Sequence, residues 1–339
     1  MLKVHMFSTA ESVKGQGVGA AYVELIQMLK NYFPDSLSIK INDYSPCDIS
    51  HYHTIDPRYY LSTFNRKKRG VLVGYVHFLP QTLEGSIKLP KVLQGLMNKY
   101  VLSFYRKMDQ LVVVNPSFID ELVAYDLPRE KITYIPNFVS KESFFPQNPS
   151  EKAEFRKSLN IPLNKMVVLG VGQIQKRKGI DDFVKLAIDN PHIQFVWAGG
   201  FSFGQITDGY DKYKKIYENP PTNLYFPGIV DRHLMNAYYN LADVFLLPSY
   251  NELFPMAILE AFSAGTAVML RDLELYHSII EDYYYPSQDV EEMHTALNQL
   301  YEDPSLLDAY KMKSQKASEF YSEANVARLW DQYYHRIVK

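Results

Sequence analysis

The sequence is almost devoid of cysteine, with Cys47 standing alone among 339 residues. No disulfide can therefore form within the chain, and a zinc site built from several thiolates is excluded. This composition is typical of a reducing compartment, and nothing in it indicates redox chemistry.

Long apolar runs are also missing, because no stretch approaches the roughly 18 uninterrupted apolar residues that would predict a transmembrane helix. The opening residues MLKVHMFSTA predict a first strand. A secretory signal is not expected, since no small-residue cleavage site follows a long apolar core. We therefore expect the protein to stay in the cytoplasm.

Acidic residues are scarce in one segment. The formal net charge is −2, yet the segment 58–107 holds ten basic residues and a single acid, Glu84. Nucleic acid is not expected as the partner, because the total charge is negative and no recognition motif accompanies the cations.

At 339 residues the chain exceeds what one core usually holds, so two domains are expected. Short apolar runs alternate with longer amphipathic stretches, which predicts parallel strands joined by helices in two doubly wound α/β domains. A Pro- and Ser-containing linker near 145–155 interrupts the pattern. We expect an N-terminal domain over 1–148, a C-terminal domain over 149–318, and a helix over 319–339 that returns to the N-terminal domain.

The most informative segment is residues 242–269, ADVFLLPSYNELFPMAILEAFSAGTAVM. It predicts a buried strand, a loop and a helix that Pro255 can open. Glu252 then precedes the helix, and Glu260 lies in its second turn. Unpaired N–H groups at the helix start favour a diphosphate, and a carboxylate one turn further in can accept hydrogen bonds from both ribose hydroxyls. The alternative is a surface helix with two solvated glutamates.

In this setting, E-x7-E resembles the signature of the retaining glycosyltransferases of family 4. The resemblance implies the GT-B fold, in which two Rossmann-like domains face each other across a cleft. It also implies that Glu252 contacts the donor hexose and Glu260 the ribose. Backbone amides near Phe254, Pro255 and Met256 are expected beside the sugar and the phosphates.

Upstream, VVLGVGQIQKRKGIDDFV resembles the strand, loop and helix with which the family holds the donor diphosphate. Lys178 stands at the family's lysine position, and with Arg177 it would stabilise the negative charge that grows on the leaving phosphate. Gln173 stands where the family commonly has arginine. The alternative is a basic loop exposed to water.

The same resemblance extends to glycines elsewhere. Gly200 is expected to line the nucleotide cleft, and Gly228 and Ile229 to flank the base; alternatively, the glycines serve only as turns.

Near the N-terminus, STAESVKGQGVGAAYVEL resembles the loop that reaches the donor phosphates, with Gly15 and Gly17 permitting close backbone approach. Its spacing also fits a dinucleotide fingerprint, but about eight residues separate it from the strand, which disfavours a nicotinamide site.

Histidines follow two predicted strands. His77, in GVLVGYVHFLP, stands where the family places an active-site histidine near the transferred sugar. The carboxyl end of a strand in a doubly wound sheet suits ligand binding, and a surface histidine is the alternative. DISHYHT resembles the family's D-x-x-H-x-H strand, in which we expect His53 to line the cleft and His51 to pack.

The basic segment also has an explanation in the resemblance. Family members that act on lipids dock their N-terminal domain on anionic bilayers, and KLPKVLQGLMNKYVLSFYRKM interleaves leucines and aromatics with cations as an interfacial helix would. The alternative is a core helix with a solvated face beside a chance basic loop. We expect residues 58–107 to meet an anionic membrane surface, with the protein peripheral on the cytoplasmic face of the cell membrane.

The motifs GQGVG, YVHFLP and GQIQKRKG most resemble bacterial diglycosyl-diacylglycerol synthases of Gram-positive lipoteichoic acid anchor pathways. The resemblance implies a retaining hexosyltransferase that moves galactose or glucose from a UDP-sugar to a glycolipid acceptor, α-glucosyl-diacylglycerol. No metal or other cofactor is expected, because no aspartate pair suited to chelating magnesium is apparent. The alternatives are a capsule or teichoic-acid sugar transferase, and a non-catalytic GT-B glycan-binding or chaperone partner.

Overall fold

The computed structural model describes residues 1–9, 17–77, 79, 91–201, 204, 209–252 and 256–338. Contacts divide the chain into two compact units. The N-terminal unit comprises the described residues of 1–138 and 321–339, and the C-terminal unit those of 139–320.

The N-terminal unit is built on a six-stranded sheet with parallel pairing and the order β2-β1-β3-β4-β5-β6. Its strands are β1 (Leu2–Phe7), β2 (Leu37–Ile41), β3 (Ile49–Tyr52), β4 (Val71–Val76), β5 (Gln110–Val113) and β6 (Ile132–Tyr134). Its helices are α1 (Gly17–Tyr32), α2 (Pro57–Ser62), α3 (Arg66–Arg69), α5 (Lys91–Lys107), α6 (Ser117–Ala124), a 3-10 turn η2 (Arg129–Lys131) and α15 (Glu323–Ile337). Strand order reverses between β1 and β3, which makes this the topological switch point of the sheet.

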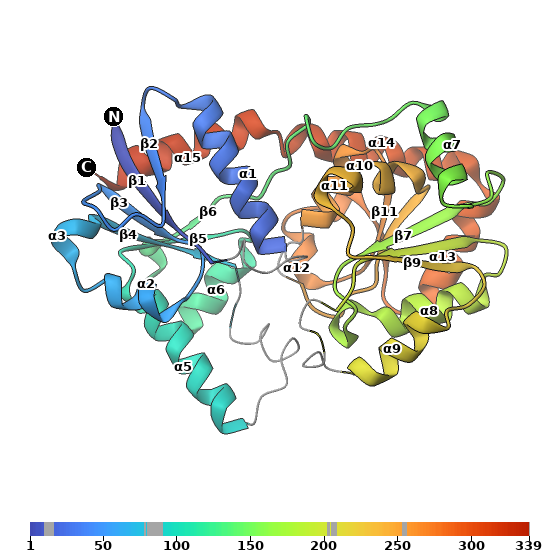
Figure 1. The fold of residues 1–339 in the computed structure, drawn as a ribbon, viewed down its shortest axis with the longest axis horizontal. Coiled ribbons are helices and arrows are strands. Elements are labelled where there is room, and N and C mark those ends of the chain that lie inside the picture. The colour runs from blue at the N-terminus through green and yellow to red at the C-terminus, as the bar shows by residue number, and fades with distance from the viewer. Residues whose placement is uncertain are drawn as a thin grey trace. The chain divides into compact units, whose positions relative to one another are not determined.

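Helices cover both faces of this sheet, with α1 and α15 on one side and α2, α5 and α6 on the other (Figure 1). Successive side chains of a strand point to opposite faces. On β3, the ring of His51 lies 5.2 Å from that of Trp330 on α15, whereas the ring of Tyr52 packs edge-on against Phe104 of α5. Both faces of the sheet are therefore buried.

The C-terminal unit repeats the plan with a second parallel sheet, in the order β12-β11-β10-β7-β8-β9. Its strands are β7 (Val167–Val171), β8 (Gln194–Ala198), β9 (Leu224–Gly228), β10 (Val244–Leu247), β11 (Ala267–Arg271) and β12 (Tyr285–Ser287). Its helices are α7 (Pro149–Ser158), α8 (Ile180–Asp189), α9 (Tyr210–Glu218), α10 (Arg232–Leu241), α11 (Met256–Ser263), α12 (Glu274–His277), α13 (Val290–Glu302) and α14 (Pro304–Phe320), with 3-10 turns η3 (Lys176–Lys178) and η5 (Glu281–Tyr283). Here the switch point lies between β7 and β10.

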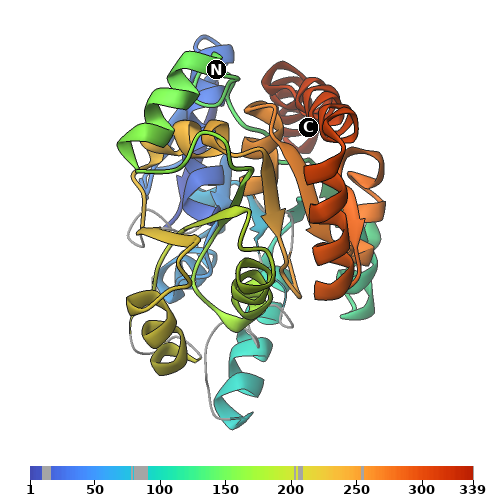
Figure 2. The same cartoon turned by 90° about the vertical axis from the view of Figure 1, so that its right-hand side faces the viewer.

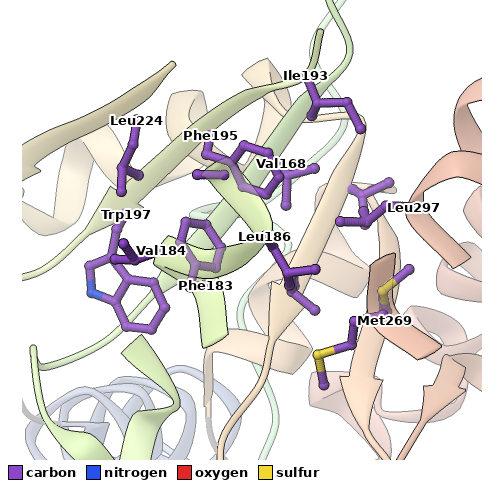
Figure 3. Close-up of a cluster of buried hydrophobic side chains, with 14 of the residues drawn as sticks. Val168, Phe183, Val184, Leu186, Ile193, Phe195, Trp197, Leu224, Met269 and Leu297 are labelled. Carbon is purple, nitrogen blue, oxygen red and sulfur yellow. The ribbon is translucent and has the colours of Figure 1, made fainter. Parts of the chain in front are cut away.

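One face of the second sheet is covered by α8, α9 and α13, and the other by α7, α10, α11 and α14; α7 and α9 lie on opposite sides of the unit in both views (Figures 1 and 2). The core beneath α8 and α13 is mainly aliphatic and includes a group of three aromatic rings, Phe183, Phe195 and Trp197 (Figure 3). Phe183 of α8 packs its edge against the rings of Phe195 and Trp197 on β8, at 5.4 and 4.9 Å between centroids. This packing fixes α8, and with it the loop that precedes the helix, against the strand ends.

The predicted alternation of strands and helices is confirmed by both sheets, but two segments differ from expectation. The stretch predicted as a linker contains α7, because Asn148 and Glu151 form a reciprocal capping box around Pro149 at the first helical position. Residues 321–322 separate α14 from α15, so the helix predicted over 319–339 begins only at Glu323. The first of these helices packs in the C-terminal unit and the second in the N-terminal unit.

Candidate active site

The candidate residues of the C-terminal unit lie at the carboxyl ends of four adjacent parallel strands. Lys178 follows β7, Gly200 follows β8, Gly228 ends β9 and Glu252 follows β10. Because β7 and β10 are neighbours at the switch point, their loops diverge there and leave room for a ligand. The fold thus brings Lys178 and Glu252 to one position from segments 74 residues apart.

An ion cluster occupies this position. Lys178 Nζ lies 2.5 Å from Glu252 Oε1, and Arg177 Nη1 lies 3.6 Å from Glu252 Oε2. Arg177 Nη1 also donates to the backbone carbonyl of Asn251 at 2.5 Å. The carboxylate side chain is only 6% exposed, so its charge depends on these two cations rather than on water.

The charges in the cluster shift the pKa values of Glu252 and Lys178. Burial raises the pKa of Glu252, but the charges of Lys178 and Arg177 outweigh burial and hold that pKa below its ordinary value. Burial lowers the pKa of Lys178, and the neighbouring carboxylate opposes this shift only in part. Glu252 is therefore an ionised acceptor at neutral pH.

The loop that carries Glu252 is fastened to the start of α8. Tyr250 donates its backbone N–H to the carbonyl of Arg177 at 2.9 Å and its hydroxyl to Asp182 Oδ2 at 2.6 Å. Arg271 forms an ion pair with the same Asp182 carboxylate and stacks its guanidinium 4.2 Å from the Tyr250 ring centroid. These contacts of Tyr250 and Arg271 with Asp182 fix the two cations and the Glu252 carboxylate relative to each other.

Two further hydroxyls are buried near Glu252. Ser249 contributes to lowering the pKa of Glu252, and Tyr276 OH has no hydrogen-bond partner in the part of the chain that the structure describes. Burial raises the pKa of Tyr276 well above its ordinary value, and the Glu252 charge raises it further. These polar groups can accommodate hydroxyls of a bound sugar.

Glu260 lies on α11 and is held by two side chains of α10. Arg232 Nη1 donates to Oε1 at 2.5 Å and Tyr239 OH donates to Oε2 at 2.6 Å. A carboxylate has about four lone-pair positions. Among the described residues these two bonds leave two acceptor positions, as many as a ribose with two hydroxyls requires.

The other residues predicted from the sequence to bind the donor nucleotide-sugar lie at the following places. Gly200 and Ile229 are neighbours, since a Cβ on Gly200 would lie 3.0 Å from Ile229 Cγ1. Gln173 accepts a hydrogen bond from the side chain of Gln175 at 2.5 Å. Gly17 is the first residue of α1 and Met256 the first of α11. Gly15, Phe254 and Pro255 lie outside the described residues.

In the N-terminal unit, His77 follows β4 and is buried. It lies beside His53, whose Nδ1 is 3.3 Å from His77 Nε2. The Tyr75 ring packs edge-on against His77 at 4.3 Å between centroids. His51 packs, as expected, against Trp330 and Tyr334.

Sequence reasoning missed the side chains that hold the candidate residues in place. Arg232 and Tyr239 lie 28 and 21 residues from their partner Glu260, and Arg271 lies 89 residues from Asp182. No local motif marks such pairs, because only the fold brings them together. Among the described residues, no three His, Cys, Asp or Glu side chains gather as a metal site requires.

Comparisons with known proteins show the family to which the chain is related. Residues 151–317 match the family described as glycosyl transferases group 1, and residues 19–143 match glycosyltransferase family 4. The chain is 51% identical over 335 residues to alpha-galactosylglucosyldiacylglycerol synthase of Streptococcus pneumoniae, which covers 99% of this chain and 90% of that protein.

Solved structures share the fold at low sequence identity. Sucrose-phosphate synthase of Thermosynechococcus elongatus matches with a TM-score of 0.81 at 16% identity, over 99% of each chain. Anabaena Alr3699/HepE in complex with UDP and glucose matches with a TM-score of 0.79 at 14% identity, over 98% of this chain and 99% of that chain.

No helix within the described ranges is both long enough and apolar enough to cross a membrane.

Proposed function

Because the chain belongs to glycosyltransferase family 4, with its GT-B fold, we propose that it transfers galactose from UDP-galactose to glucosyl-diacylglycerol. The enzyme is a UDP-sugar-dependent hexosyltransferase that retains the anomeric configuration, so the new linkage is α. The 51% identity to a synthase of galactosylglucosyl-diacylglycerol supports galactose as the donor sugar and glucosyl-diacylglycerol as the acceptor.

The observation that carries the chemistry is the buried cluster of Lys178, Arg177 and Glu252 at the switch point. Departure of UDP places negative charge on the diphosphate, and preorganised cations stabilise charge where it develops. In the proposed complex Lys178 and Arg177 face the diphosphate, while Glu252 accepts hydrogen bonds from the hexose. The two cations take the charge-stabilising role without a divalent metal.

Glu260 holds the ribose in this proposal. Its two remaining acceptor positions match the two ribose hydroxyls, and Arg232 and Tyr239 keep the carboxylate in one orientation. Gly200 and Ile229 lie at the ends of β8 and β9, where the uracil would pack. We assign the donor nucleotide to the C-terminal unit on this basis.

The acceptor and the membrane are assigned to the N-terminal unit. On the first half of α5, Leu93, Leu96 and Met97 are exposed, whereas the second half is buried through Val101 and Phe104. The helix thus combines the interfacial and core roles that its sequence allows. We propose that its exposed half inserts at an anionic bilayer, placing the protein peripherally on the cytoplasmic face.

Only some of the cations of segment 58–107 belong to this surface. Lys67, Lys68 and Lys99 are exposed and suit contact with lipid headgroups. Arg66 instead pairs with Asp109 at 2.5 Å. Arg69 is buried and donates to backbone carbonyls of residues 43–45, so it supports the fold rather than the proposed lipid contact.

A transfer assay tests the proposal. Purified protein is incubated with glucosyl-diacylglycerol in phosphatidylglycerol vesicles and with UDP-galactose or, in a parallel arm, UDP-glucose. We expect a diglycosyl lipid with an α-linked hexose, formed faster from UDP-galactose, as identified by mass spectrometry and NMR. Absence of lipid product with both donors would overturn the proposal, and a glucose-only product would overturn the donor assignment.

A further inference from the structure

We propose that His53 is a positioning residue that orients His77 through a hydrogen bond between the two imidazoles. The inference rests on the proposed function and on the family resemblance, which implies an active-site role for His77. It deepens that function by assigning a task to a buried residue that the chemistry described above does not use.

The location of His53 carries the first part of the argument. His53 follows β3, and its backbone N–H donates to the carbonyl of Phe7, the last residue of β1, at 2.8 Å. It therefore lies at the switch point between β1 and β3, where ligands bind in open α/β sheets. Its Nδ1 lies 3.3 Å from Nε2 of His77.

Protonation fixes the direction of this hydrogen bond. Burial lowers the pKa of His77 to about 3 and lowers that of His53 well below its ordinary value, so both rings are neutral near pH 7. If His77 were the donor, the remaining proton of His53 would sit on Nε2, which is buried and has no partner among the described residues. An orphaned buried N–H is rarer than an orphaned acceptor. His53 therefore donates from Nδ1, and His77 carries its proton on Nδ1.

Neighbouring rings hold His53 in this orientation. The ring centroids of His51 and His53 are 4.2 Å apart, and Tyr22 of α1 packs edge-on against His53 at 4.9 Å. His51 is itself bonded through Nδ1 to Tyr334 OH of α15 at 2.8 Å. Tyr334, His51 and His53 thus form a chain of contacts from α15 through β3 to His77. These contacts restrict His77 to one ring orientation and one tautomer.

The test substitutes His53 in the full-length protein. His53→Leu removes the donor, whereas His53→Asn retains a hydrogen-bonding group near the position of Nδ1. His5→Asn is the matched control, since it changes a buried histidine of the same sheet whose ring bonds to the backbone carbonyl of Asp43 and not to His77. We expect kcat to fall about tenfold or more in His53→Leu, with the KM for UDP-galactose changed less than about twofold, and His53→Asn to recover most of the loss.

Imidazole nitrogen NMR of protein labelled with 15N-histidine gives a readout that does not depend on activity. The His77 signals, assigned with a His77→Asn variant, should report protonation on Nδ1 in the wild type and in His5→Asn, and a mixture of tautomers in His53→Leu. Unchanged His77 signals in His53→Leu would overturn the inference. Normal turnover in His77→Asn would instead refute the active-site role that the resemblance implies for His77, and the NMR result would still decide the hydrogen bond.

Discussion

At the scale of single residues, Glu252 and Lys178 satisfy each other's charge in a place from which water is nearly excluded. Motifs in the sequence indicate both residues, because each stands in a loop between a buried strand and a helix. The motifs do not indicate that the two are in contact, since that depends on β7 and β10 being neighbours. The partners Arg232 and Tyr239 of Glu260 have no sequence signal at all.

Removing either member of the pair should reduce turnover. Glu252→Gln and Lys178→Ala are expected to lower kcat at least about tenfold, because each removes an interaction with the reacting donor. The controls are Glu274→Gln and Lys176→Ala, which change exposed residues of the same unit. Turnover within twofold of the wild type in either test variant would show that the pair does not act on the donor.

At the scale of elements, the loop before α8 packs directly against the loop after β10. The closest approach is at Gly179, whose φ is +72° and where a Cβ would lie 2.2 Å from the carbonyl oxygen of Pro248. The sequence predicts both loops from their glycine and proline content. It does not predict their mutual fastening, because Tyr250 and Arg271 reach Asp182 across 68 and 89 residues.

Adding a methyl group at this contact should separate the two loops. Gly179→Ala is expected to lower the free energy of unfolding by about 1–3 kcal/mol and to weaken UDP binding, because backbone must move away from backbone. Gly95→Ala is the control, since nothing lies within 4 Å of a Cβ there. In the helix interior it should stabilise by about 0.5–1 kcal/mol. Thermal unfolding and UDP titration of both variants measure the difference, and equal behaviour would contradict the account.

The exposed half of α5 provides a second prediction at this scale. Leu93→Ser combined with Leu96→Ser should reduce co-sedimentation with phosphatidylglycerol vesicles at least about tenfold, because burying each leucine contributes about 1.5–3 kcal/mol. Ile188→Ser is the control, as it removes an equally exposed apolar side chain from α8 of the C-terminal unit. Unchanged sedimentation of the double variant would exclude α5 as the membrane contact.

For the whole molecule, the alternation of apolar runs predicts both doubly wound sheets correctly. Short elements were missed: β12 has three residues and α12 four, which is too few for periodicity to show. The helix α15 carries an apolar stripe that the sequence reveals, but its contact with β3 joins residues 283 positions apart. Which surface α15 packs against depends on the shape of the sheet face around β3, and that shape forms only when the strands are assembled.

The buried cluster of His51, His53 and His77 should make the stability of the protein depend on pH. Burial lowers the pKa of His51, His53 and His77 in the folded state. Below the ordinary histidine pKa of about 6.5, the unfolded chain binds protons that the folded chain does not. The free energy of unfolding should therefore fall as pH drops below about 6.5, by about 1.4 kcal/mol per histidine at pH 5.5.

The measurement is urea unfolding followed by Trp330 fluorescence in a Trp197→Phe background, which leaves one tryptophan, in contact with His51. His51→Asn should shrink the loss between pH 7.5 and 5.5 by about 1.4 kcal/mol, because one titrating histidine of the cluster is removed, while His5, whose pKa burial also lowers, and His277, whose pKa Asp272 raises, titrate in every variant. A free energy of unfolding that is flat across this range would contradict the burial of neutral histidines.

The central claim is that Lys178 grips the donor diphosphate, and titration calorimetry with UDP tests it most directly. The account predicts that the wild type binds about one UDP per chain, that Lys178→Ala weakens binding roughly tenfold or more, and that Lys176→Ala leaves it unchanged. Absence of UDP binding in the wild type, or equal affinity in Lys178→Ala, would contradict it.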